Sequence, residues 1–248
     1  MTFIYISQLY HFLSPANIQT MNLFVLAQLA VDAAKYHCDK HCIKMILEIC
    51  QLLYTAHWYN SETPDFPPSP ELLAKYGKDD PYRMTHKNHP VAVWVRAKKA
   101  HYDYTVKLGL ELSKDYSRRF GKIHRCHYHL QRLKYMGYPL HRVPETYKAP
   151  PHKRATVGLP VGVDYFDVCI ADKDGLFERC ARYDADGNLN CVDSYRAYYH
   201  TKEWDLKWNR GKDLTPVWYT KVYVPVPKVD KKRKASESKL PIKKIKIS

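Results

Sequence analysis

Apolar residues recur at helical spacing between Ala33 and Trp58, in a stretch that contains neither glycine nor proline. One apolar stripe consists of Cys38, Cys42, Met45, Ile49, Leu52 and Ala56, and a second of Ile43, Leu47 and Cys50. Steps of three and four residues place each stripe on one face of a helix. We therefore predict one helix that begins near Val31 or Asp32, ends near Trp58 and is apolar on nearly all sides.

A single polar line runs between these two stripes. This polar ridge consists of residues spaced four, three, four and three apart: His37, His41, Lys44, Glu48 and Gln51. The apolar flanks predict that the polar ridge lies in a cleft rather than on open surface. Burying such groups costs free energy unless they pair or take part in chemistry. Two explanations stay open: a structural ladder with Lys44 paired to Glu48, or a catalytic site.

A second long helical pattern extends from Val91 to Phe120. It starts after Asn88-His89, where Pro90 suits the first turn of a helix, and Gly121 follows its end. Further helices are predicted at Glu71–Tyr76, Ile123–Met136 and Cys191–Trp208. Two long helices therefore dominate the expected fold.

The remaining segments are less regular. We predict that residues 1–20 are an N-terminal extension, and that MNLFVL at 21–26 is extended. Residues 164–190 predict a small β-hairpin, because Tyr165–Ala171 and Leu176–Tyr183 alternate around a turn that ends in Asp-Gly.

The expected architecture is therefore mainly α. We predict a single helical domain over residues 21–226, built on two long helices with the β-hairpin inserted. A disordered basic tail follows at 227–248, because KVDKKRKASESKLPIKKIKIS cannot bury a core.

Charge points to a polyanionic partner. Lys and Arg number 40 against 25 Asp and Glu, which gives a formal net charge of +15. A nucleic acid is the first expectation, DNA with RNA as an alternative, and an anionic membrane surface is the second. No apolar run is long enough to span a membrane, so we predict no transmembrane helix and no membrane among the partners. Seven cysteines without framework spacing indicate an intracellular protein with reduced thiols.

The polar ridge is compatible with two kinds of chemistry. His37 and His41 could bind one zinc ion, with Glu48 or His89 completing the set, but Lys44 would repel a cation. A metal-dependent hydrolase is therefore the last alternative, and no metal or cofactor is predicted. In metal-free chemistry, Glu48 would stabilise the oxocarbenium-like sugar that forms when a nucleoside loses its base.

Two stretches resemble a group of proteins from large DNA viruses and phages. Residues 22–51 and 88–122 carry the shared motifs MNLFVL, YHCDKHCIKMILE-QLL, NHP-AVW and LGLEL-K-Y-RFGK-H. Later pieces, at Asp193–Tyr199 and from Lys207 to Trp218, fit the same pattern. The resemblance to that group implies no particular activity. Within a virus, the basic run at 231–246 has the layout of a host nuclear-import signal or of a nucleic-acid-binding arm.

More remotely, the layout is similar to pyrimidine-dimer DNA glycosylases of the phage endonuclease V type. Asp39-Lys40-His41 followed by Glu48 matches their active-site motif. The resemblance implies that Glu48 is the catalytic carboxylate and that His41 positions the substrate. It also implies an amine nucleophile that forms a Schiff base with the sugar. Gln51 stands where that family has an Arg.

For the amine, Asn22 (after a start at Met21), Thr2 and Lys44 stay open. We therefore expect a DNA glycosylase and lyase-like enzyme, with Glu48, His41, Lys44 and His37 as catalytic residues. A non-catalytic DNA- or RNA-binding protein is the alternative. The residues expected to contact nucleic acid are Gln51, Asn88, His89, Arg96, Arg118, Arg119 and Lys122.

Overall fold

The computed structural model describes residues 21–61, 63–139, 151–171, 173–202, 206–210 and 215–219. These residues form eight α-helices: α1 (Ala30–Tyr36), α2 (Asp39–Asn60), α3 (Pro70–Tyr76), α4 (Pro90–Ala97), α5 (Lys99–Phe120), α6 (Cys126–Met136), α7 (Leu176–Cys180) and α8 (Cys191–His200). They also form two short 3-10 turns, Pro151–Lys153 and Lys173–Gly175, and two strands, β1 (Arg154–Ala155) and β2 (Phe166–Asp167). The predicted mainly α fold is confirmed. The predicted extension at 1–20 and basic tail at 227–248 lie outside the described residues.

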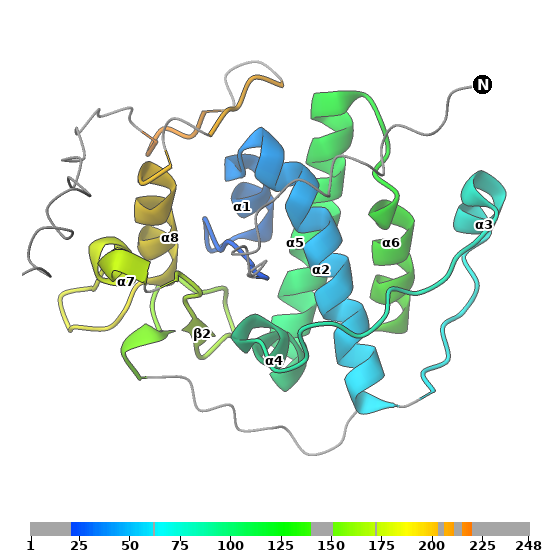
Figure 1. Ribbon diagram of the computed structural model, residues 1–248, viewed down its shortest axis with the longest axis horizontal. Helices are drawn as coiled ribbons and strands as arrows, with labels where there is room; N and C mark the ends of the chain where they lie inside the picture. Colours follow the sequence, from blue (N-terminus) through cyan, green and yellow to red (C-terminus); the bar gives the residue numbers. More distant parts are fainter. Residues whose placement is uncertain are drawn as a thin grey trace, which may run out of the picture.

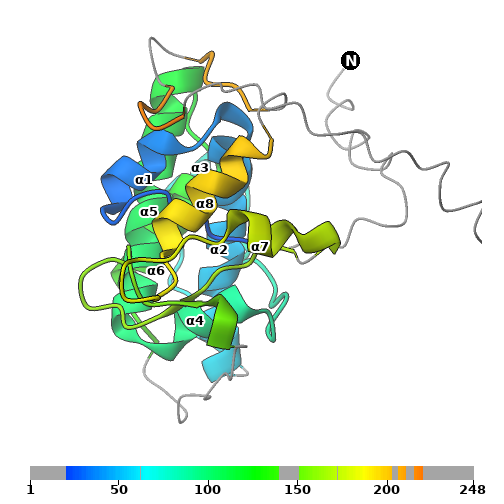
Figure 2. The ribbon, with the colours of Figure 1, turned by 90° about the vertical axis from the view of Figure 1, so that its left-hand side faces the viewer.

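The centre of the molecule is the pair of 22-residue helices α2 and α5. α2 packs against α5, α4 and α6, and α1 packs against α5. Figure 1 shows α6 and α3 on one side of this pair and α1, α7 and α8 on the other, and Figure 2 shows the same arrangement from the side of α8. The two stretches with the strongest helical pattern are therefore the scaffold for everything else.

Three helices meet closely at Gly109 of α5. A Cβ atom at this position would lie 2.7 Å from Cγ2 of Ile49 in α2 and 2.8 Å from Cδ2 of Leu130 in α6. These distances are shorter than ordinary van der Waals contact, so any side chain here would push the helices apart. The absence of a side chain at Gly109 lets both helices approach α5.

The predicted first helix is interrupted, and the prediction of one continuous helix is wrong. His37 and Cys38 have extended ψ angles of 132° and 164°, so α1 ends before them and α2 begins after them. The backbone N–H of Asp39 donates to the carbonyl of Lys207 over 2.8 Å instead of bonding within α1. The interruption is therefore caused by a partner at the far end of the described sequence, which helical periodicity does not reveal.

The second predicted helix is also two helices, divided at Lys98 (φ −147°, ψ 150°). Nδ1 of His101 donates to the carbonyl of Trp94 over 2.7 Å, and the two rings stack with centroids 4.3 Å apart. The His101 side chain therefore gives the Trp94 carbonyl a hydrogen bond that a backbone N–H would supply in a continuous helix. The remaining predicted helices differ from the structure only at their ends, since α6 begins at Cys126 and α8 ends at His200.

The small antiparallel sheet has different strands from those predicted. β1 pairs with β2, with Arg154 opposite Asp167 and Ala155 opposite Phe166. The predicted second strand instead contains helix α7, in which Phe177 and Cys180 are buried. Spacing of three residues places both side chains on one face of a helix but on opposite faces of a strand. The hairpin predicted at 164–190 is therefore wrong in its pairing, although β2 falls within it.

Asp167 is a buried carboxyl whose ionisation opposes folding. It is 3% exposed, and neither carboxylate oxygen has a hydrogen-bond partner. Burial raises the pKa of Asp167 to about 6, and the guanidinium of Arg154 opposes the rise. The pKa of an Asp side chain in the unfolded protein is lower, near 4. The contribution of Asp167 to stability is therefore greatest below pH 4 and is lost as the pH rises through 6.

We expect Asp167→Asn to raise the free energy of unfolding by about 1–3 kcal/mol near pH 7.5 and to change it little near pH 4. Urea denaturation at both pH values measures the difference. The exposed Asp186 provides the control, because Asp186→Asn should change stability by less than about 0.5 kcal/mol at either pH. An equal effect of Asp167→Asn at both pH values would contradict an ionisation effect.

Candidate functional site

Glu48 follows two lysines along one face of α2. Lys40, Lys44 and Glu48 are spaced four residues apart, so they succeed one another along the helix. Both lysines are exposed, whereas Glu48 is 7% exposed. Gln51 lies three residues further along and is half-buried. The structure therefore keeps Lys44, Glu48 and Gln51 of the polar ridge together.

Two nitrogens contact the carboxylate of Glu48. Nζ of Lys44 lies 2.9 Å from Oε1, and the backbone N–H of Asn22 donates to Oε2 over 3.1 Å. Burial raises the pKa of Glu48, and the hydrogen bond and charge of Lys44, followed by the amide of Asn22, oppose the rise. Glu48 is therefore a desolvated carboxylate with an amine against one oxygen and a backbone nitrogen against the other.

The side chain of Asn22 fixes the position of this backbone nitrogen. Its Oδ1 accepts from the hydroxyl of Tyr195 (2.9 Å) and from the backbone N–H of Leu23 (2.7 Å). Its Nδ2 donates to the carbonyl of Cys169 over 3.0 Å. All six residues of the MNLFVL segment at 21–26 are buried without regular secondary structure, and the contacts of the Asn22 side chain hold its start in place.

His41 is packed among aromatic side chains. Its Nδ1 is hydrogen-bonded to the hydroxyl of Tyr199 at 2.7 Å, and its ring stacks on Phe24 with centroids 4.8 Å apart. Burial lowers the pKa of His41 well below its usual value, and the neighbouring His37 and lysines lower it further. His41 is therefore a neutral imidazole with a fixed orientation near neutral pH, which suits a positioning role.

His37 does not belong to the polar ridge, because α1 ends just before it. Its Nδ1 donates to the carbonyl of Ala33 over 2.6 Å, and its Nε2 is buried without a hydrogen-bond partner. Burial lowers the pKa of His37 to about 4, and the charge of Arg119 also lowers it. The prediction that His37 supports catalysis is corrected: it is a fully buried residue that ends α1.

His86 lies near enough to Glu48 to influence its carboxylate, and no pattern in the sequence indicates it. Its positive charge would lower the pKa of Glu48, and its Nδ1 is hydrogen-bonded to the hydroxyl of Thr85 at 2.6 Å. The side chain is exposed, and the backbone has φ +48°, which is uncommon for a residue other than glycine. His86 precedes α4 in an irregular segment, so no periodicity could have indicated it.

The predicted nucleic-acid contacts before and within α4 differ in exposure and in their role in the fold. Asn88 is exposed, whereas Nδ1 of His89 accepts from the backbone N–H of Val91 over 3.3 Å and caps the helix. Burial lowers the pKa of His89 to about 4. Arg96 is buried with its guanidinium 3.9 Å above the ring of Tyr59. Arg96 is therefore a packing residue, which corrects its predicted contact with nucleic acid.

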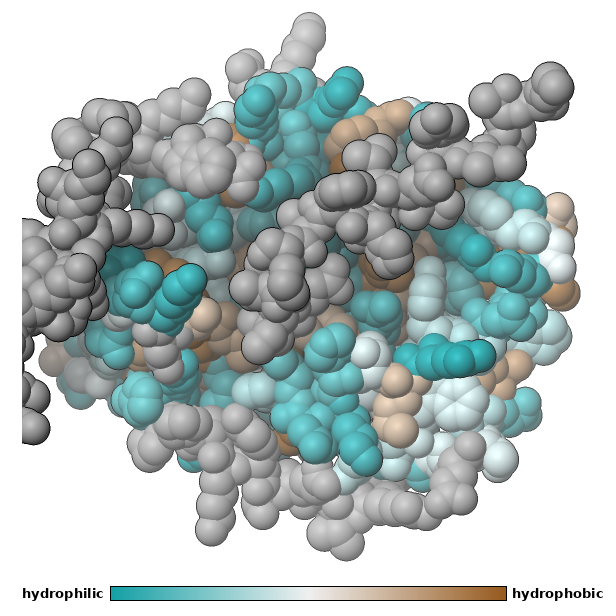
Figure 3. Space-filling view, in the orientation of Figure 1, coloured by the Kyte–Doolittle hydropathy of each residue, from teal (hydrophilic) through white to brown (hydrophobic). Residues whose placement is uncertain are grey.

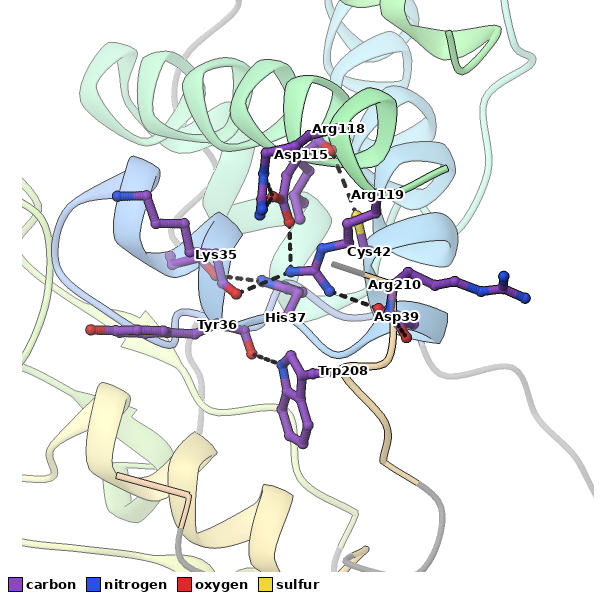
Figure 4. Close-up of polar contacts among 12 residues, drawn as sticks. Lys35, Tyr36, His37, Asp39, Cys42, Asp115, Arg118, Arg119, Trp208 and Arg210 are labelled. Carbon is purple, nitrogen blue, oxygen red and sulfur yellow. Dashed lines mark hydrogen bonds and ion pairs between the residues drawn. The ribbon is translucent and has the colours of Figure 1, made fainter. Parts of the chain in front are cut away.

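The last turn of α5 holds one buried and one exposed arginine. Arg118 is half-exposed and paired with Asp115, and Lys122 is exposed just beyond the helix. Arg119 has no exposed side-chain surface, and its guanidinium lies 3.0 Å from Asp39 and 2.6 Å from Asp115 (Figure 4). Its predicted contact with a phosphate is therefore corrected: Arg119 stabilises the junction of α1, α2 and α5.

The described residues contain no group of three or more His, Cys, Asp or Glu side chains arranged to hold a metal ion. The two histidines of the zinc alternative are separated by the interruption between α1 and α2, and a hydrogen bond engages Nδ1 of each. All seven cysteines lie within the described residues and are free thiols. None of the described helices has the length and apolar character needed to cross a membrane.

Comparison with protein-family models, with curated proteins and with solved structures found no match for this chain.

Proposed function

We propose that this protein acts on DNA as a glycosylase with lyase activity, centred on Glu48. The observation that carries the proposal is the buried carboxylate of Glu48 with the amine of Lys44 at 2.9 Å and the backbone nitrogen of Asn22 at 3.1 Å. A carboxylate in this state stabilises positive charge that develops on a sugar. An amine beside it is placed to attack the same sugar.

The reaction has three steps. The amine attacks C1′ of the deoxyribose while the bond between C1′ and the base breaks, and the base leaves with the proton that the amine gives up. The sugar ring then opens, O4′ takes a proton, and a protonated imine joins C1′ to the amine nitrogen. Loss of a proton from C2′ finally expels the 3′ phosphate. A raised pKa brings the Glu48 carboxylate closer to accepting the proton that an ammonium group must lose.

Two nitrogens are candidates for the nucleophile. Lys44 carries the only side-chain amine that contacts Glu48 among the described residues. The nitrogen of Asn22 is a peptide nitrogen in the full chain and cannot attack a sugar. A chain that began at Asn22 would instead present a free α-amine 3.1 Å from Oε2 of Glu48.

The proposed substrate class follows from the charge of the chain. The net charge of +15 favours a phosphate backbone, and DNA is the proposed partner with RNA as the alternative. On the face shown in Figure 3, hydrophilic residues are interspersed with intermediate and hydrophobic ones over the described surface. We also propose an intracellular location, with entry to a host nucleus through the basic segment at 231–246.

Borohydride trapping tests this function. The protein is incubated with DNA that contains either an abasic site or a pyrimidine dimer, and borohydride is added to reduce any imine to a stable bond. We expect a covalent adduct on a denaturing gel, and peptide mapping by mass spectrometry then identifies the modified nitrogen. Modification at Lys44 and modification of an α-amine at Asn22 distinguish the two nucleophiles. No adduct with either DNA would reject the proposal.

A non-catalytic nucleic-acid-binding protein is the second candidate. One observation favours it: both oxygens of Glu48 already have partners within the protein, as in a structural ion pair. This candidate predicts no adduct, together with salt-dependent DNA binding that survives Glu48→Gln.

A further inference from the structure

A basic hollow opens at the start of α2. Its volume is about 350 Å³, and it is lined by Asp39, Lys40, Lys207, Asn209 and Arg210. Three of these five side chains are cations and one is a carboxylate. Lys40, Lys207 and Arg210 are all exposed, so an anion can approach them from solvent. None of these three residues was expected to contact nucleic acid.

The carboxylate of Asp39 does little to cancel this positive charge, because it is already engaged. Oδ2 accepts from the backbone N–H groups of Asn209 (2.8 Å) and Arg210 (3.2 Å), and Oδ1 pairs with the buried Arg119 at 3.0 Å. Figure 4 shows this arrangement, with the Arg210 side chain directed away from the cluster. Behind the hollow, Arg118 and Arg119 equal Asp115 and Asp39 in number, so among the described residues the lining has more cations than carboxylates.

The lining is held in place by the segment at 206–210. Nε1 of Trp208 donates to the carbonyl of Tyr36 over 3.1 Å. Trp208 is buried, and it lies in the chain between the exposed residues Lys207 and Arg210. The carbonyl of Lys207 accepts from the N–H of Asp39 over 2.8 Å. These bonds fix the backbone on both sides of the hollow, so little ordering is required when a ligand binds.

The hollow lies in line with the candidate catalytic residues. Lys40, Lys44 and Glu48 occupy one face of α2, and eight residues of helix place Lys40 about 12 Å from Glu48 along the axis. Phosphates of one strand in a duplex advance by about 3.4 Å per nucleotide along its axis, so this separation corresponds to three or four nucleotides. A strand with its reacting sugar at Glu48 therefore has a phosphate within reach of the hollow.

We propose that this hollow binds a backbone phosphate of the nucleic acid, three or four nucleotides from the residue at Glu48. The position relative to Glu48 rests on the proposed function, whereas phosphate binding itself rests on the charge and shape of the hollow. Lys40, Lys207 and Arg210 supply the contacts. They position the strand without selecting its sequence, because phosphate contacts carry no base information.

The test compares two triple variants with the same loss of charge. The first is Lys40→Ala, Lys207→Ala and Arg210→Ala, and the control is Lys78→Ala, Lys107→Ala and Lys134→Ala, which removes three exposed lysines outside the hollow. Fluorescence anisotropy measures Kd for an undamaged duplex oligonucleotide across a range of salt concentrations. Thermal melting of both variants establishes that they are folded.

We expect the hollow variant to raise Kd about tenfold and to reduce the slope of log K against log salt by about 1, the value for one phosphate. The control should raise Kd less than about threefold with little change in slope. Inorganic phosphate, added at constant ionic strength, should compete with the oligonucleotide for the full-length protein but not for the hollow variant. Equal effects of the two triple variants would overturn the proposal.

The binding experiment tests the phosphate site separately from the glycosylase proposal. It measures the affinity for undamaged DNA, on which the proposed reaction forms no adduct. A failed borohydride trap with a selective effect of the hollow variant would reject the enzyme and retain the phosphate site. A successful trap with equal effects of both triple variants would retain the enzyme and reject the phosphate site. Competition by inorganic phosphate without a selective effect on oligonucleotide binding would show a site for free phosphate and overturn the assignment to a strand.

Discussion

Replacing Arg119 by Met is expected to lower the free energy of unfolding by about 3–5 kcal/mol. The Arg119 side chain is fully buried and pairs with both Asp39 and Asp115, and its Nη2 also donates to the carbonyl of Lys35 over 3.1 Å. Removing the guanidinium leaves two largely buried carboxylates close together without their cation. Equilibrium denaturation in urea measures the loss.

Arg118→Met provides the matched control, because Arg118 pairs with the same Asp115 but its side chain is 50% exposed. Solvent screens an exposed ion pair, so this variant should cost less than about 1 kcal/mol. Asp115→Asn in the Arg119→Met background should recover part of the lost stability. Similar small losses for the two arginine variants would contradict the structural role of Arg119.

Replacing Glu48 by Gln is expected to slow formation of the borohydride-trapped adduct by about 10²–10⁴-fold. Gln has the same shape and keeps an oxygen for the backbone N–H of Asn22, but it loses the negative charge that would stabilise the sugar cation. DNA affinity should change less than about threefold, because Glu48 contributes no attraction to a phosphate. Single-turnover trapping on abasic DNA measures the rate, and anisotropy measures the affinity.

Glu111→Gln is the control for this prediction. Glu111 also pairs with a lysine on its own helix, Lys114, at 2.8 Å, but on α5 rather than beside Asn22. Its replacement should leave the trapping rate unchanged. A Glu48→Gln variant that formed the adduct as fast as the Glu111→Gln variant would remove Glu48 from the chemistry and favour the non-catalytic alternative.

The hydrophobic pattern predicts the two long helices because their buried stripes are local features of the sequence. It does not predict where they are interrupted. The break before Asp39 depends on the hydrogen bond that the backbone N–H of Asp39 donates to the carbonyl of Lys207, and the break at Lys98 depends on how His101 packs against Trp94. Both causes are tertiary contacts, and a pattern that repeats every three or four residues contains no information about them.

The candidate site was predicted in part. Lys44, Glu48 and Gln51 lie on one helix, so their spacing alone places them together. The contact between Asn22 and Glu48 and the approach of His86 depend on packing between segments far apart in the chain. The sequence places Arg119 on the surface for a related reason: a basic residue near the end of a helix usually faces solvent, and only the folded chain brings two carboxylates around it.

The carboxylate of Asp39 also has a consequence for folding order. It joins the start of α2 to the backbone of Asn209 and Arg210, which are among the last described residues of the chain. Closing so long a loop costs more entropy than forming the contacts between α2 and α5, so this junction is expected to form after the helical centre.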